Sequence, residues 1–211
     1  GGAGGIGRAA AEELLGEGAC VVLLDIDPAA LEPVGAELAR QHGADRVRTA
    51  RADVTDEASV AAAFDHAVLE FGGVDILVSG AGIASSAAFD EITLAHWNQN
   101  LGILATGYFL VARAAFRIMK RQGTGGSIVF IGSKNALAAS EKAAAYNTAK
   151  AAELHLARCI ALDGAPHGIR ANVVNPDAVL RGSRIWAGTW REERAAAYGV
   201  GAGELEEHYR K

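Results

Sequence analysis

The chain opens with GGAGGIGRAAAEELLGEGACVVLLD, residues 1–25, and this stretch decides the fold. Glycines among the first seven residues let the backbone approach a ligand closely, and they lead into RAAAEELLG, which has the composition of a helix. The apolar residues 20–24 that follow have the length of a buried strand. A glycine turn alone could be a flexible tail, but a glycine turn, a helix and a buried strand in succession predict a pyrophosphate site at the helix N-terminus.

Asp25 is the acidic residue that ends this strand. An acidic side chain about twenty residues after the glycines suits the two ribose hydroxyls of an adenosine, and this predicts NAD as the cofactor. The alternative is that Asp25 caps the helix expected to begin near Asp27 and Pro28.

Strand patterns recur along the chain at residues 46–51, 74–78 and 173–175, with helical stretches between them. Strands that alternate with helices predict an α/β, Rossmann-like, doubly wound parallel sheet with helices on both faces. We expect a single domain over residues 1–211. Because no strand precedes Gly1 and the chain stops at Lys211 in a charged, helical stretch, we expect a fragment truncated at both ends that lacks the first and last strands of its sheet.

Tyr146 and Lys150 lie four residues apart in AYNTAKAA, and Ser133 lies thirteen residues earlier. Positions i and i+4 share a helix face, and a neighbouring cation lowers the pKa of a phenol toward the range of a general acid/base. A serine at a strand end could hold the substrate oxygen. The alternatives are a chance pair on a solvated helix face and a serine that satisfies only local backbone.

Composition narrows the class of protein. The chain has 211 residues, is 50% hydrophobic and carries a net charge of −5, which suits one soluble, cytoplasmic domain and leaves no basic surface for nucleic acid. The 2 cysteines and 6 histidines lack the spacing of a metal site or a disulfide framework. We expect no bound metal and no membrane span.

These motifs, taken together and in this order, resemble the short-chain dehydrogenase/reductase family over essentially the whole chain. The resemblance implies hydride transfer between NAD and an alcohol or carbonyl compound, with Ser133, Tyr146 and Lys150 as catalytic residues. It also assigns cofactor contacts along the chain, to Gly1, Gly5, Ile6, Gly7, Asp25, Asp53, Val54, Gly80, Ala81, Gly82, Tyr146, Lys150 and Pro176.

A narrower resemblance lies in the stretches HWNQNLGILATGYFL, SIVFIGSKNALAAS and NVVNPDAVLRGSRIW. They are similar to the dehydrogenase half of the bifunctional rhamnulose-phosphate aldolase/short-chain dehydrogenases. This resemblance implies a role in carbohydrate catabolism, a substrate such as lactaldehyde or another deoxysugar-derived hydroxy compound, and an aldolase domain fused to this one. The expected long helices at residues 94–121 and 143–164 pair between subunits in the family, which implies a homo-oligomer.

The sequence departs from the family pattern at two positions. Ser79 stands where an asparagine is usual, and Leu104 stands where the family has the helix asparagine that orders a water beside the lysine. Asn100, one turn earlier, could replace that asparagine in catalysis, or it could be an ordinary polar position. Leu104 also supports an alternative function, a catalytically silent dinucleotide-binding sensor or scaffold.

Polar residues outside these motifs favour no single interpretation. Lys134 and Asn135 could contact a polar substrate or lie in a solvated loop. Arg181 or Arg184 could bind a carboxylate or phosphate, or could be ordinary surface charge.

Overall fold

Five parallel strands form the centre of the computed structural model, which describes residues 1–179, 182–183, 186 and 190–210. The strands are β1 (Val21–Asp25), β2 (Val47–Arg51), β3 (Ile76–Ser79), β4 (Gly126–Ile131) and β5 (Ile169–Val174). The α-helices are α1 (Gly5–Gly16), α2 (Pro28–His42), α3 (Glu57–Phe71), α4 (Leu94–Leu101), α5 (Gly107–Gln122), α6 (Ala144–Gly164), α7 (Trp190–Tyr198) and α8 (Leu205–Arg210).

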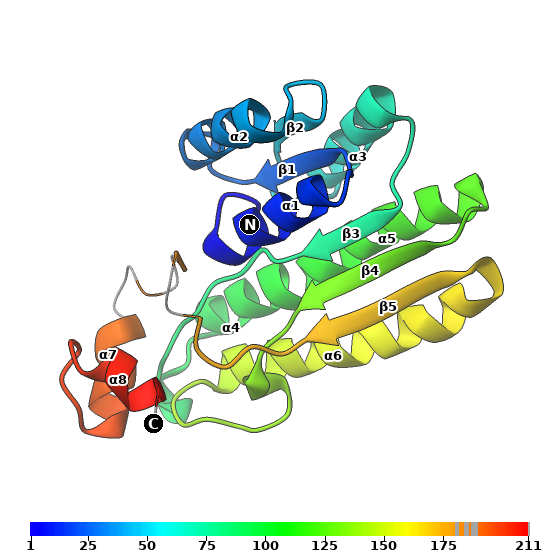
Figure 1. Ribbon diagram of the computed structural model, residues 1–211. Helices are drawn as coiled ribbons and strands as arrows, with labels where there is room; N and C mark the ends of the chain where they lie inside the picture. The colour runs from blue at the N-terminus through cyan, green and yellow to red at the C-terminus, as the bar shows by residue number, and fades with distance from the viewer. Residues whose placement is uncertain (180–181, 184–185, 187–189, 211) are drawn as a thin grey trace.

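The strands form two groups (Figure 1). β1 pairs with β2 in register Val21 to Val47, and β4 pairs with both β3 and β5. Within the described residues, β1 and β3 are not hydrogen-bonded to each other. The α/β, Rossmann-like fold with parallel strands is therefore confirmed, and the sheet is interrupted between β1 and β3.

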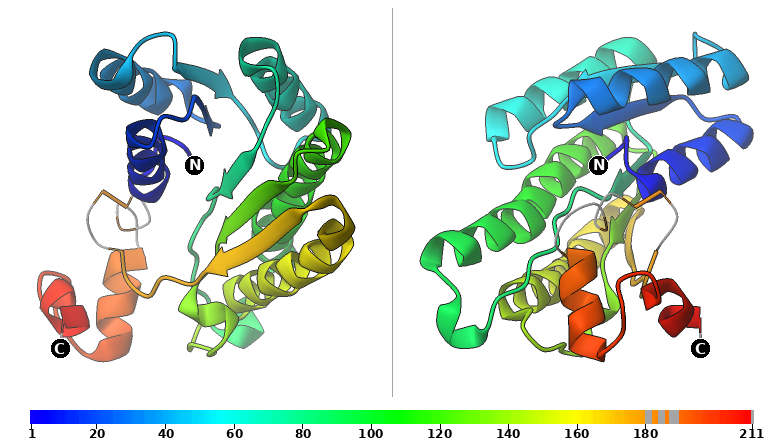
Figure 2. Two further views of the ribbon diagram at one scale, coloured as in Figure 1. Left: turned by 45° about the vertical axis from the view of Figure 1, so that its right-hand side comes forward. Right: turned by 90° about the vertical axis from the view of Figure 1, so that its left-hand side faces the viewer.

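Helices cover both faces of the strands (Figure 2). α1 and α2 pack on β1 from one side, whereas α5 packs on β3 and β4, and α6 on β4 and β5, from the other. The apolar residues of VVLLD in β1 and GSIVFI in β4 are partly or fully buried along the length of each strand.

Each strand group has its own hydrophobic core. The larger core lies around β3, β4 and β5 and includes Phe130, Tyr108 and Met119. The smaller core lies between β1, α1 and α2 and includes Leu23 and Leu38. We call the two parts the β1–β2 half and the β3–β5 half.

The expected long helix at residues 94–121 is interrupted by a π-helical turn at Gly102–Thr106. Leu94–Gln122 is the one helical run in the described part of the chain whose length and hydropathy would let it cross a membrane. Its α5 portion buries Tyr108 and Met119 in the larger core and leaves Arg117 and Lys120 exposed. It therefore has the pattern of a core helix.

Candidate active site

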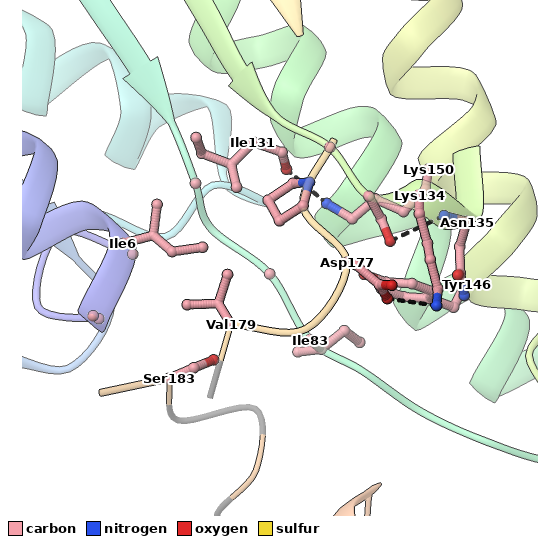
Figure 3. Close-up of a pocket in the computed structure, with 18 of the residues that line it drawn as sticks. Ile6, Ile83, Ile131, Lys134, Asn135, Tyr146, Lys150, Asp177, Val179 and Ser183 are labelled. Atoms are coloured by element: carbon pink, nitrogen blue, oxygen red, sulfur yellow. Dashed lines mark hydrogen bonds and ion pairs between the residues drawn. The ribbon is translucent and has the colours of Figure 1, made fainter. Parts of the chain in front are cut away.

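Ser133, Tyr146 and Lys150 converge at the ends of β4 and α6, as the sequence predicts. Ser133 follows β4 and is fixed by its backbone N–H, which donates to Asn175 Oδ1 at 3.1 Å. Tyr146 and Lys150 lie one turn apart in α6, and the Lys150 Nζ is 5.9 Å from the centre of the Tyr146 ring. All three side chains are buried and line one cavity of about 210 Å³. Figure 3 shows Tyr146 and Lys150 among the residues of this cavity.

Lys150 is held from two sides. Its Nζ donates to the carbonyl oxygen of Ile131 at 2.9 Å, and to the two carboxylate oxygens of Glu153 at 2.9 and 3.1 Å. Tyr108 donates its hydroxyl to the same Ile131 carbonyl at 3.0 Å. Sequence reasoning missed Glu153; the signal was an acidic residue three positions after Lys150, on the same face of the helix.

The titratable groups of this cluster have shifted pKa values. Burial raises the pKa of Tyr146, the charge of Glu153 raises it further, and a hydrogen bond with Ser133 acts in the opposite direction. This differs from the expectation that Lys150 lowers the pKa of Tyr146, because burial outweighs the other influences. Burial also lowers the pKa of Lys150 and raises that of Glu153 to about 8.

The glycine turn has the close backbone packing that its sequence predicts. A Cβ at Gly7 would lie 2.3 Å from the Gly1 carbonyl oxygen, and one at Gly1 would lie 2.5 Å from the Gly80 carbonyl oxygen. α1 begins at Gly5 with Gly4 as a cap that supplies no side chain. The Gly5 N–H donates to the Gly182 carbonyl oxygen at 3.0 Å, and the first turn of the helix lines the smaller cavity, where a helix N-terminus favours an anion.

A second cavity, of about 440 Å³, adjoins the first and lies between β1 and β3. Asp25, Asp53 and Val54 line it. Asp25 is buried at the end of β1, and its carboxylate accepts hydrogen bonds from the N–H groups of Ala3 and Asp27. The cap of α2 is Asp27, whose side chain accepts from Ala29 and Ala30, so the alternative role for Asp25 is not the one observed.

Asp53 has its carboxylate Oδ1 bound by Thr55, through the hydroxyl at 2.7 Å and the backbone N–H at 2.9 Å. These bonds lower the pKa of Asp53. A carboxylate fixed in this way is a preset acceptor at the rim of the larger cavity.

The two cavities meet at the glycine turn and at the segment after β3. Residues that line both include Gly1, Gly7, Gly80, Ala81 and Gly82, and Gly5, Ile6 and Pro176 line the smaller one. The predicted cofactor residues therefore surround one continuous path from Asp53 to Tyr146. Ser79, at the family's asparagine position, is buried at the end of β3.

Asn100 and Leu104 are both fully buried, but neither bonds to Lys150. The Asn100 carboxamide donates to the Ser85 hydroxyl and the His96 carbonyl, each at 2.9 Å. Leu104 packs in an apolar cluster with Tyr146 and Trp190. Within the described contacts, the structure does not bring Asn100 to the catalytic cluster, and its place in a relay stays a prediction.

Aromatic and charged side chains close the outer end of the smaller cavity. Trp190 lies with its ring centre 6.0 Å from that of Tyr146, and Trp186 also lines the cavity. Lys134 forms an ion pair with Asp177 there (Figure 3), and the buried Asn135 amide donates to Ser140 and Asn147. Arg181 and Arg184 lie outside the described residues.

The residues around this path fit a dinucleotide: a glycine turn that a Cβ would fill, a helix start without a side-chain cap, and two carboxylates at the far end. Among the described residues, no group of three or more His, Cys, Asp or Glu side chains is placed to hold a metal ion. Fold and site together define an α/β oxidoreductase that binds a nicotinamide dinucleotide. The match of residues 1–192 to the short chain dehydrogenase model places the chain more narrowly: it belongs to the short-chain dehydrogenase family, whose members bind NAD or NADP.

Relatives with oxidoreductase names support this assignment. The uncharacterized oxidoreductase YuxG of Bacillus subtilis is 52% identical over 211 residues, which are 100% of this chain and 31% of that protein. The D-threitol dehydrogenase of Mycolicibacterium smegmatis is 35% identical over 190 residues, 89% of this chain and 72% of that protein. The structure of sorbitol-6-phosphate 2-dehydrogenase SrlD from Erwinia amylovora matches with a TM-score of 0.91 at 28% identity, over 99% of this chain and 80% of that one.

Proposed function

We propose that the protein containing this chain transfers a hydride between NAD and an alcohol or carbonyl substrate. The observation that carries the proposal is that Tyr146, Lys150 and Ser133 line the same cavity as the glycine turn. A reacting hydroxyl and a dinucleotide bound along the glycine turn would therefore meet at these side chains.

Each residue of this cluster has a role that its chemistry suits. Tyr146 takes the proton of the substrate hydroxyl during oxidation and returns it to the carbonyl oxygen during reduction. Ser133 hydrogen-bonds the substrate oxygen, where charge develops. Burial raises the pKa of Tyr146; a positive charge on Lys150 would act in the opposite direction, toward the phenolate, and Lys150 would also hold the nicotinamide ribose. Bound NAD supplies the carbon that accepts or gives the hydride.

We propose NAD rather than NADP as the cofactor because Asp25 lies at the end of β1, where the ribose of an adenosine would be bound. A buried carboxylate accepts hydrogen bonds from a ribose diol and repels a 2′-phosphate. The glycine turn of residues 1–7 contains no basic side chain to offset that repulsion. The remaining cofactor contacts are proposed because their residues line the two cavities: Asp53, Val54, residues 80–82 and Pro176.

Small hydroxylated compounds are the proposed substrates, such as lactaldehyde or another deoxysugar-derived hydroxy compound in carbohydrate catabolism. Support comes from the names of similar proteins, which include a dehydrogenase of D-threitol and one of sorbitol-6-phosphate. The polar groups at the outer end of the cavity, Lys134 and Asp177, suit a substrate with several oxygens.

Further proposals concern the full-length protein, its assembly and its location. A further domain such as an aldolase is consistent with the similarity to YuxG, of which the matched region is 31%. Residues 1–211 would be one dehydrogenase domain. A homo-oligomer through α5 and α6 would cover Phe109 and Leu162, which are exposed, and we place the protein in the cytoplasm.

Steady-state assays of the full-length protein test this function. NADH formation should be measured with a panel of small polyols and hydroxy-aldehydes, alongside NAD binding followed by tryptophan fluorescence. Turnover with at least one compound is expected. Tight NAD binding without turnover on any alcohol or carbonyl compound would instead favour the sensor or scaffold.

A further inference from the structure

Glu153 is a buried carboxyl group that the reaction above does not use, although it touches the lysine on which that reaction depends. It lies three residues after Lys150 in α6, and its side chain is 0% exposed. The side chain of Lys150 is 5% exposed, so neither charge is well solvated. Burying a carboxylate away from water costs several kcal/mol unless a partner compensates it, so the two residues depend on each other.

The titratable groups that face this pair come from two helices. α6 supplies Tyr146, and α5 supplies Tyr108, whose ring centre is 5.2 Å from Lys150 Nζ. β4 contributes only the carbonyl of Ile131. In the part of the chain that the structure describes, Lys150 is therefore the cation that compensates Glu153, and the two tyrosines are the groups that feel its charge.

Glu153 also supplies the hydrogen-bond partner of Lys150 that Leu104 cannot provide. Leu104 stands where the resemblance places an asparagine that would hold a water beside the lysine, and a leucine offers Lys150 no hydrogen bond. The Glu153 carboxylate meets Lys150 directly, with both oxygens as acceptors. In this chain the polar partner of the lysine comes from its own helix.

Building on the proposed function, we propose that Glu153 is a positioning residue of the catalytic pair: its carboxylate holds the Lys150 ammonium and raises the pH at which Tyr146 and Lys150 together give up a proton. A negative charge makes every neighbouring group hold its proton more tightly. Because groups this close titrate together, the direction is the same whether Tyr146 or Lys150 releases the proton. The raised pKa of Tyr146, to which Glu153 contributes, agrees in direction.

The test compares pH profiles of kcat/KM for alcohol oxidation in the full-length wild-type protein and in Glu153→Gln. The glutamine side chain keeps the size of the original and an acceptor for Lys150 but removes the charge. The rising limb of the profile should shift to lower pH by about one unit or more. This is the effect expected from removing one charge a few ångströms away in a partly screened site. The Tyr146 titration can also be followed by tyrosinate absorbance, as the difference between each protein and its own Tyr146→Phe variant. Its midpoint should shift to lower pH in Glu153→Gln, and this measurement needs no turnover.

Two variants serve as controls. Glu153→Asp keeps the charge and should restore most of the wild-type profile. Asp163→Asn removes an exposed carboxylate from the last turn of the same helix and should leave the profile in place. Coinciding profiles for Glu153→Gln and wild type would overturn the proposal, and so would an equal shift in Asp163→Asn.

A measurement on the wild type guards against a glutamine variant that does not fold. Carbon-13 NMR of labelled glutamate should show one carboxyl group that stays protonated to about pH 8. A Glu153 carboxyl group that stays protonated through the rising limb of the profile would overturn the proposal, because a neutral group cannot raise the pKa of its neighbours by charge. A wild-type protein that folds and binds NAD but turns over no alcohol refutes the proposed function, while this titration still tests Glu153.

Discussion

The β1–β2 half and the β3–β5 half contribute to the site in different ways. The β3–β5 half has the larger core and supplies side chains: Ser133, Tyr146, Lys150 and Glu153 all follow or pack on its strands. The β1–β2 half and its glycine turn contribute mainly backbone, with Asp25 as the principal side chain. Catalysis therefore depends on side chains that a substitution can remove. Nucleotide binding depends on close backbone packing that an added side chain would disrupt.

Tyr146→Phe should give the largest effect and falls in the β3–β5 half. The change removes the transferable proton but keeps the ring beside Trp190. We expect kcat to fall by about 10²-fold or more, because general acid–base catalysis typically contributes that much. NAD affinity, measured by fluorescence titration, should be unchanged. Near-normal turnover in the variant would remove Tyr146 from its role.

Gly7→Ala tests the β1–β2 half by adding one methyl group. The new Cβ would lie 2.3 Å from the Gly1 carbonyl oxygen, so the turn must shift. The pyrophosphate needs close approach of the backbone at this turn, so we expect NAD to bind on the order of tenfold more weakly or worse. Gly16→Ala is the matched control, since a Cβ there meets nothing within 4 Å. Equal NAD affinities in the two variants would contradict the account of the turn.

Asp25→Ala addresses the carboxylate of the β1–β2 half that should select the cofactor by its charge. We expect wild type to prefer NAD over NADP by about tenfold or more in kcat/KM, and the variant to lose most of that preference. Asp27→Ala removes a nearby carboxylate that caps α2, and should cost about 1 kcal/mol of stability while leaving the preference intact. A wild-type protein that uses both cofactors equally well would refute this role of Asp25.

Asn100→Ala should have the smallest effect on turnover. Its carboxamide bonds Ser85 and His96, so its loss leaves buried polar groups unsatisfied and should lower the free energy of unfolding by about 1–3 kcal/mol. We expect kcat within about twofold of wild type, measured beside a urea unfolding curve. Severalfold slower turnover at unchanged stability, partly restored by Leu104→Asn, would instead return Asn100 to the proton relay.

Local patterns predicted most of the fold because they are set by neighbours in sequence. The apolar run before Asp25 became β1, and the long apolar helix appeared with its charged face outward. The π-helical turn at Gly102–Thr106 was not predictable, because Gly102 at its start and Gly107 directly after it are compatible with a continuous α-helix as well.

In the site, too, local sequence determines some features and tertiary packing determines others. The spacing of Tyr146 and Lys150 puts them on one helix face whatever surrounds them, whereas burial and charge decide their pKa values. Glu153 could be read as a solvated helix residue until the packing of α5 and β4 buried it. Tertiary packing also fixed the partners of Asn100, which helix geometry alone would allow to face Lys150.

The Ile131 carbonyl, which receives both Lys150 and Tyr108, has a consequence for how this enzyme could diverge. A backbone oxygen is encoded by no codon, and every amino acid at position 131 would present it. A substitution at position 131 would therefore keep the carbonyl that binds Lys150, whereas a substitution at Glu153 would change its other partner. Selection or engineering could exchange Glu153 to retune the working pH while Lys150 stays in place, so the pH optimum can evolve separately from the geometry of the active site.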